Sequence, residues 1–157
     1  MKNQTQVPTD LKTALVNLDT FFDLYLVKKA PSLPENVKEI IVKYAPYLSI
    51  IGLIFSAWGL LMLLGFSALF APAVLLSGAR FGLNTLISIV FVLVTVVLEA
   101  MAISGLFSRK ASAWKLLFYV ALINAIYSLI RFDLGSLVIG TAVSLYFLYQ
   151  VKSYYKN

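Results

Sequence analysis

The sequence contains no cysteine and no histidine, and only 13% of its 157 residues carry a charge. Without cysteine the chain has no disulfides and no thiol chemistry. Without histidine it lacks the commonest general base and the usual ligand of haem iron and catalytic zinc. No cofactor and no metal ion are therefore expected. The low charge content also argues against a soluble domain, in which about a quarter of the residues are charged.

Apolar residues dominate the composition, since 61% of the chain is hydrophobic. The few charges are unevenly distributed along it. Five of the seven acids and six of the thirteen bases precede residue 46, whereas residues 46–107 contain only Arg80 and Glu99. This distribution predicts a polar N-terminal segment, residues 1–45, followed by a membrane domain, residues 46–157.

The membrane domain contains four apolar stretches, at about 47–69, 83–106, 113–130 and 134–151. Each has roughly 18–24 residues, which is enough for a helix to cross about 30 Å of hydrocarbon. The linker at 70–82 is moderately apolar but too short to hold a further span. We therefore expect an all-α, polytopic membrane protein whose four spans form a transmembrane helix bundle.

Two shorter helices are expected in the N-terminal segment, at about 9–29 and 34–45, separated by prolines. Apolar residues recur in the first of them at steps of three and four, and its charged residues would be costly inside the bilayer. It is therefore an amphipathic helix that lies on a surface, either of the membrane or of the chain's own membrane domain. Pro46 predicts a kink before the first span.

Lysine and arginine are concentrated on one side of the predicted spans. Eleven of the thirteen bases lie in the N-terminal segment, in the 107–115 connection or at the C-terminus, and only Arg80 and Arg131 lie on the other side. Basic connections face the cytoplasm, so we expect a cell-membrane protein with both termini in the cytoplasm. The same pattern accounts for the net charge of +6, and nucleic acid is not expected as a partner.

An interfacial anchor is predicted where the third span begins. It consists of Arg109, Lys110 and Trp114, because basic and tryptophan side chains favour the boundary between hydrocarbon and water. Contact with anionic lipid is the more specific form of this prediction.

Each predicted span also presents a stripe of small or polar residues, which in membranes lets helices approach and hydrogen-bond. The stripes are Ser49, Gly52, Ser56 and Gly59; Asn84, Ser88, Thr95 and Glu99; Ala121, Asn124, Ala125 and Ser128; and Ser136, Gly140 and Ser144. Their presence in all four spans favours one compact bundle.

Glu99 is the only acid inside the predicted spans, and it lies seven residues from the end of the second span. That distance places it roughly 10 Å into the hydrocarbon. An ionised carboxylate is costly at this depth, so the group tends to keep its proton. Counted by depth, the candidate partners of Glu99 are Asn124, Ser144, Tyr119 and Trp58.

Two interpretations of Glu99 follow. It either carries a proton or binds a cation or polar head group, or it is a neutral hydrogen-bonding peg that fixes helix register. The second interpretation fits the function that the sequence favours, a small non-enzymatic scaffold or accessory subunit, and the first makes the protein, as the alternative, an oligomeric transport or channel component. An enzyme is not expected, because the sequence offers no nucleophile with a base and no paired carboxylates. The expected partners are the lipid bilayer and either further copies of the chain or another membrane protein.

Overall fold

The computed structural model describes residues 11–69, 71–72 and 79–156, and it is helical almost throughout. In chain order the elements are α1 (Leu11–Phe22), the π-helical η1 (Asp23–Lys29), α2 (Glu35–Leu69), α4 (Ala79–Phe107), α5 (Ala111–Ile130), the π-helical η2 (Ser136–Gly140), α6 (Thr141–Gln150) and the 3₁₀ turn η3 (Lys152–Tyr154). The described residues form no strand, and one isolated backbone bridge joins Lys110 to Lys156. The expected all-α class is confirmed.

Three helices in the described part of the chain are long and apolar enough to cross a membrane: Glu35–Leu69, Gly82–Phe107 and Ala111–Ile130. They contain the first three predicted spans and are compatible with an integral membrane protein. The region of the fourth predicted span is shorter, because η2 has 5 residues and α6 has 10. Together they reach only about 22 Å. Most of the 70–82 linker, and residues 9 and 10, lie outside the described residues.

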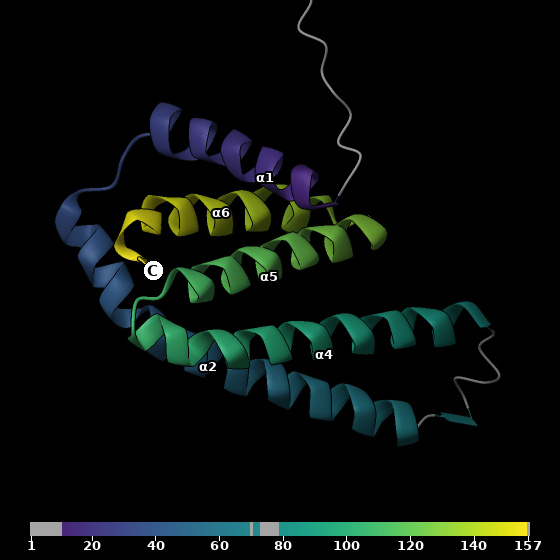
Figure 1. Cartoon of the computed structure of the whole chain (residues 1–157). Coiled ribbons are helices and arrows are strands. Elements are labelled where there is room, and N and C mark those ends of the chain that lie inside the picture. The colour runs from purple at the N-terminus through teal and green to yellow at the C-terminus, as the bar shows by residue number, and fades with distance from the viewer. Residues whose placement is uncertain (1–10, 70, 73–78, 157) are drawn as a thin grey trace, which may run out of the picture.

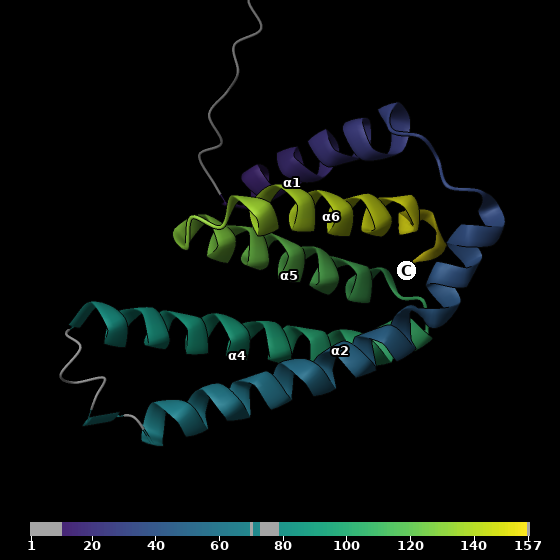
Figure 2. The same cartoon turned by 180° about the vertical axis from the view of Figure 1, so that it is seen from behind.

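The helices form a row in which each packs on the next (Figures 1 and 2). α2 packs on α4, α4 on α5, α5 on α6, and α6 on η1. Within the described ranges no other pair of these long helices packs extensively. The arrangement is compatible with the expected helix bundle, although the outer helices α2 and α6 do not pack extensively on each other. Short connections join α4 to α5 and α5 to η2, so neighbours in sequence are also neighbours in space.

α2 joins the predicted N-terminal segment to the predicted membrane domain. It runs without interruption from Glu35 to Leu69 and contains Pro46, which is buried. In Figures 1 and 2 the first part of α2 lies across the ends of α5 and α6, and the remainder runs beside α4. Proline removes one backbone hydrogen bond and bends a helix without having to end it. Pro46, the position of the predicted kink, therefore lies inside a helix that continues on both sides of it.

The hydrophobic core lies toward one end of the row, which we call the packed end. α2, α4, α5, α6 and the C-terminal residues all contribute to it, through Val42, Leu106, Ala113, Trp114, Phe118, Ala121, Leu145, Tyr149, Val151 and Tyr155. This end also holds the α4–α5 turn and the C-terminus (Figure 1). The opposite end, where α5 leads into η2, we call the open end.

α1 and η1 lie lengthwise beside α6 in both views (Figures 1 and 2). Phe22 and Leu26 pack against the core, and the ring of Phe22 lies 6.3 Å from that of Phe118 and 6.0 Å from that of Tyr149. Of the two surfaces considered for the 9–29 helix, the structure therefore shows contact with the chain's own helices.

Candidate functional site

Helices α2, α4 and α5 contribute to a groove with a volume of about 450 Å³, which we call the Glu99 groove. Its lining residues are Ser56, Gly59, Leu63, Ser88, Val92, Thr95, Glu99, Asn124, Tyr127 and Arg131. Glu99 is the only acid among them and Arg131 is the only base. The groove therefore combines one carboxyl group and one guanidinium with hydroxyl and amide groups on mostly apolar helices.

The carboxyl group of Glu99 has a buried oxygen, Oε2, without a hydrogen-bond partner among the described residues. Thr95, one turn away, donates its hydroxyl to the carbonyl of Val92 in its own helix at 2.9 Å. A buried polar atom without a partner is destabilising by on the order of 1–3 kcal/mol. Because a structural peg acts through its hydrogen bonds, this geometry favours the binding interpretation of Glu99.

The four residues expected around Glu99 do not all reach it. Asn124 lines the Glu99 groove and also a second cavity, of about 480 Å³, where Ser144 lies. Tyr119 and Trp58 line neither of these two cavities, and they are 37% and 61% exposed. Counting residues along a helix gives the depth of a side chain but not its direction around the helix axis. Depth alone therefore does not determine which residues line the Glu99 groove.

A chain of hydrogen bonds crosses the Glu99 groove toward the open end. Arg131 Nη1 donates to the hydroxyl of Tyr127 at 2.8 Å, and Tyr127 donates to Ser88 Oγ at 2.9 Å. Ser88 in turn donates to the carbonyl of Asn84 at 2.8 Å. These bonds connect α5 to α4. Sequence reasoning missed Tyr127, although its spacing of four residues from Arg131 put both on one helix face.

The glycines of the small-residue stripes do not mark tight helix contacts. A methyl group added at Gly52, Gly59 or Gly140 would meet no neighbouring atom within 4 Å. At Gly105 the same group would lie 2.8 Å from the Cβ of Ala113. The expectation that the stripes bring helices together is therefore wrong at the first three positions. The close approach is instead between the end of α4 and the start of α5.

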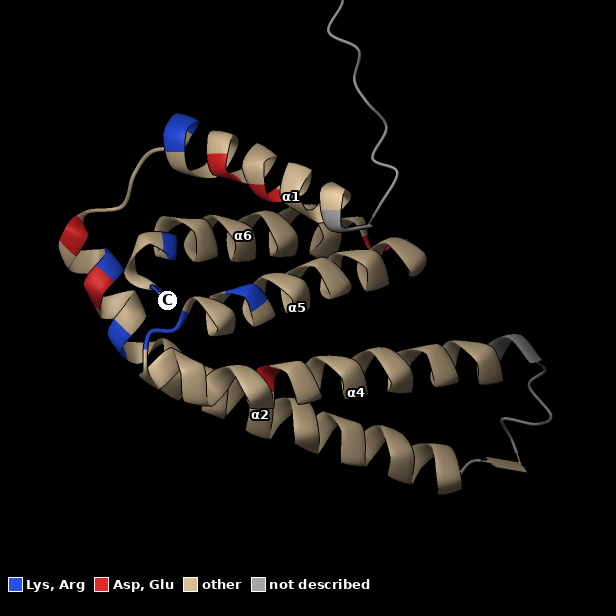
Figure 3. Cartoon of the chain, in the orientation of Figure 1, with Lys and Arg blue, Asp and Glu red and all other residues tan. Residues whose placement is uncertain are grey.

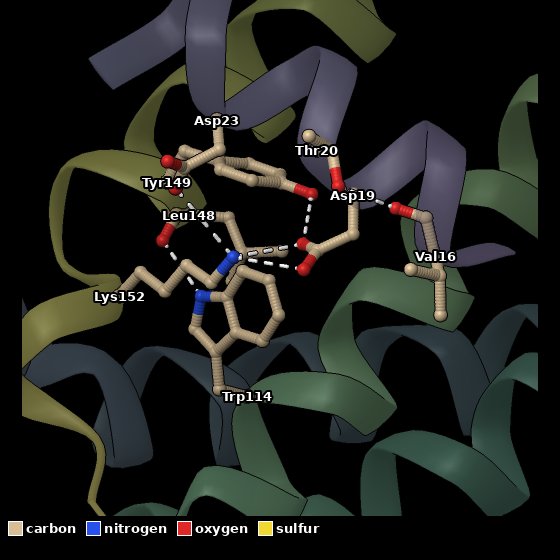
Figure 4. Close-up of polar contacts among 8 residues, drawn as sticks. All are labelled: Val16, Asp19, Thr20, Asp23, Trp114, Leu148, Tyr149 and Lys152. Atoms are coloured by element: carbon tan, nitrogen blue, oxygen red, sulfur yellow. Dashed lines mark hydrogen bonds and ion pairs between the residues drawn. The ribbon is translucent and has the colours of Figure 1, made fainter. Parts of the chain in front are cut away.

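A second polar cluster fastens the N-terminal helix to the end of α6 (Figure 4). Lys152 Nζ lies 2.9 and 3.0 Å from the two carboxylate oxygens of Asp19 and 3.6 Å from Asp23. Tyr149 donates its hydroxyl to Asp19 at 2.6 Å. The ammonium group also lies 4.8 Å from the ring centroid of Trp114, close enough for a cation–π contact. We call Asp19, Asp23, Tyr149 and Lys152 the N-terminal clasp.

Side chains of α6 also hold the connection between η1 and α2. The amide of Gln150 donates to the carbonyl of Leu26 at 2.8 Å and accepts from the backbone amide of Leu33 at 3.2 Å. Tyr146 donates to the carbonyl of Pro31 at 2.7 Å. Sequence reasoning missed these contacts. The available signal was a glutamine at the end of an otherwise apolar span.

Trp114 differs from its predicted role in an interfacial anchor. Its side chain is only 5% exposed, it donates its indole N–H to the carbonyl of Leu148 at 2.8 Å, and it stacks on Phe118. Trp114 is interior because α6 covers the face of α5 on which it lies. Arg109 and Lys110 are exposed, in contrast.

Among the described residues, no three acidic side chains come together as a metal-binding group. Comparison of the chain with protein-family models, with curated proteins and with solved structures found no match. The functional inference therefore depends on the Glu99 groove and on the surfaces around it.

Proposed function

We propose that the protein is a small, non-enzymatic integral membrane protein that takes up a proton, a cation or a polar head group at Glu99, as a component of a transport or channel assembly. The observation that supports this most directly is the buried Oε2 atom of Glu99, which no described residue engages. Acids inside membranes are costly, and Oε2 of this one has no hydrogen-bond partner among the described residues, whereas a structural peg acts through such bonds. Asn124 in the same groove offers a further oxygen atom to a bound cation.

The proposal includes four membrane spans with both termini in the cytoplasm. Eleven of the thirteen bases lie on the side of the termini, which supports this orientation. In Figure 3 most basic residues of the described chain lie toward the packed end, whereas Arg131 follows α5 at the open end. The short η2–α6 segment completes the fourth crossing where the bilayer thins around it.

Assembly with further copies, or with another membrane protein, is part of the same proposal. α2 is the outermost helix of the row, and none of its spanning window is buried. A groove lined by only three helices opens to its surroundings, so a single chain encloses no complete path. A second helix layer against α2 would supply the missing wall through close van der Waals packing.

The substitution Glu99→Gln tests the use of the acid, because glutamine keeps the size of the side chain and removes its proton chemistry. We expect wild-type protein in proteoliposomes to conduct protons or monovalent cations, followed with a pH-sensitive dye and with ion-selective dyes. Glu99→Gln should abolish this flux. Its thermal unfolding midpoint in detergent should stay unchanged or rise, because the buried carboxyl that it replaces has an unpartnered oxygen.

Glu39→Gln is the matched control, since it makes the same chemical change at an exposed acid outside the Glu99 groove. It should leave both flux and stability unchanged. A clear fall of the midpoint in Glu99→Gln would instead assign the acid to the fold and count against transport.

A scaffold or accessory subunit is the second candidate. It is favoured by the large apolar side chains that α2 presents outward, among them Ile54, Phe55 and Leu61, which are 62%, 73% and 65% exposed. Under this alternative a partner helix covers α2, and Glu99→Gln leaves the complex intact. Native mass spectrometry after mild extraction distinguishes the two: a homo-oligomer favours transport, and a defined complex with another membrane protein favours the scaffold.

A further inference from the structure

A hollow of about 660 Å³ lies at the packed end, where the α4–α5 turn meets the C-terminus. Two backbone hydrogen bonds join these segments. The amide of Ala111 donates to the carbonyl of Lys156 at 3.1 Å, and the amide of Lys156 donates to the carbonyl of Arg109 at 3.0 Å. Backbone pairing therefore fixes this wall of the hollow, and the side chains on it start from defined positions.

Three cations line the hollow: Arg109, Lys110 and Lys156. All three are exposed, and in the described part of the chain none of them forms an ion pair. The one acid of the hollow is Glu35, whose carboxylate accepts hydrogen bonds from Lys38 at 3.0 Å and from Tyr154 at 2.6 Å. The positive charge of the hollow is therefore largely uncompensated and attracts anions.

Arg109 has an unfavourable backbone conformation, with a φ angle of 51° in the left-handed region. Arg109 lies just past the end of α4. The backbone amide of Lys110 donates to the carbonyl of Gly105 at 2.8 Å, and the backbone amide of Arg109 donates to the carbonyl of Leu106 at 3.1 Å. This is a Schellman motif, and its left-handed position usually holds glycine, which has no Cβ to clash. An arginine with this strain suggests that the side chain has a use.

The turn at the open end provides a matched reference. Phe132 has a φ angle of 56° and follows α5 in the same motif. The backbone amide of Asp133 donates to the carbonyl of Ser128 at 2.9 Å, and that of Phe132 donates to the carbonyl of Leu129 at 3.1 Å. Its side chain is 85% exposed and has no charge. The two turns share their backbone strain and differ in the chemistry of the strained residue.

We propose that the hollow at the α4–α5 turn binds a phosphoryl group, which is either the headgroup phosphate of an anionic phospholipid or free phosphate. The planar fork of the Arg109 guanidinium matches two phosphate oxygens, and Lys110 and Lys156 add compact positive charges. In Figure 3 the basic turn and the C-terminus lie together at the end of the apolar helices. Lipid headgroups stand at this level of a membrane. The inference does not depend on Glu99.

The substitution Arg109→Gly separates charge from strain. Purified protein is placed in phosphatidylcholine nanodiscs with and without phosphatidylglycerol, and lipid binding is measured by native mass spectrometry. We expect wild-type protein to prefer phosphatidylglycerol and Arg109→Gly to bind it about fivefold more weakly, the factor for one basic residue near a charged surface. The thermal midpoint of Arg109→Gly in phosphatidylcholine alone should rise, because glycine relieves the strain. A variant that is merely misfolded would not combine weaker binding of phosphatidylglycerol with a higher thermal midpoint.

Phe132→Gly is the control, and it should gain stability while binding phosphatidylglycerol as the wild type does. Arg109→Gln removes the charge but keeps the strained backbone, so it should lose binding without gaining stability. Inorganic phosphate added to phosphatidylcholine nanodiscs distinguishes the two sources of the phosphoryl group. If phosphate raises the thermal unfolding midpoint as phosphatidylglycerol does, and Arg109→Gly removes this effect, the ligand is free phosphate. The proposal fails if both Arg109 variants bind phosphatidylglycerol and phosphate like the wild type, or if Phe132→Gly loses binding equally.

Discussion

The packed end and the outer face of α2 are built on different principles. At the packed end the rings of Trp114, Phe118 and Tyr149 lie with centroids 5.3–5.9 Å apart, and the N-terminal clasp lies beside them. In α5, which contributes two of these rings, 28% of the spanning window is buried, against 0% in α2. Lipid tails are as apolar as leucine, so burial alone does not hold membrane helices together. The packed end adds aromatic packing and hydrogen bonds, whereas α2 leaves its face available to lipid or to a partner.

The largest contrast is expected between the two tryptophans. Trp114→Ala should lower the free energy of unfolding by about 3–5 kcal/mol, because it removes a buried ring and the hydrogen bond from the indole N–H to the carbonyl of Leu148. Trp58→Ala should cost less than about 1 kcal/mol, because Trp58 is 61% exposed. Denaturant unfolding in detergent measures both. Equal losses of unfolding free energy in the two variants would mean that the outer face of α2 is covered in the native assembly, and the packed end and α2 would then not differ.

Two glycines give the next largest difference. Gly105→Ala should destabilise by about 1–3 kcal/mol, because its Cβ would lie 2.8 Å from that of Ala113. Gly59→Ala on α2 has open space around it and should be neutral or stabilising by up to about 1 kcal/mol. The thermal midpoint reports both changes. Ala113→Gly should rescue Gly105→Ala, and failure of this rescue would assign the loss to another cause.

The N-terminal clasp should contribute less. Lys152→Met removes the cation held by Asp19, but the two side chains are 31% and 39% exposed, so the expected loss is about 1 kcal/mol. Limited proteolysis of the N-terminal segment should become faster. Lys38→Met breaks the pair with Glu35, which is 74% exposed, and should change stability by less than about 0.5 kcal/mol. Unchanged proteolysis in Lys152→Met would mean that apolar contacts alone hold α1.

The smallest effect is expected from the hydrogen bond between Tyr154 and Glu35. Donation to the carboxylate raises the pKa of Tyr154 from 10.0 to about 12. Because the pKa is raised in the folded protein, the bond contributes fully below about pH 10 and is lost as the pH rises through about 12. Phenolate absorbance against pH measures this. Glu35→Gln should bring the pKa of Tyr154 down toward 10.0, and an unchanged titration would exclude Glu35 as the cause.

Part of this architecture could be predicted from local patterns. The bounds of α4 and α5 lie within four residues of those expected, because the length of an apolar stretch is a property of the segment itself. Glu99 and Asn124 line one groove, as polar residues at similar depths suggest. The orientation of a side chain around its helix is not local, which is why Trp58 and Tyr119 line neither cavity and Trp114 lies in the interior.

By itself the sequence predicted an all-α chain with four apolar stretches, three of which are helices long enough to span a membrane, and it concentrates most basic residues in the N-terminal segment, the 107–115 connection and the C-terminus. These properties depend on composition and spacing, which each segment carries alone. Only the tertiary structure decided that Trp114 is interior, that Gly105 marks the tight helix contact and that Lys152 holds Asp19. The last contact joins residues 133 positions apart. Such pairings depend on which helix faces meet, and no local pattern in the chain specifies that choice.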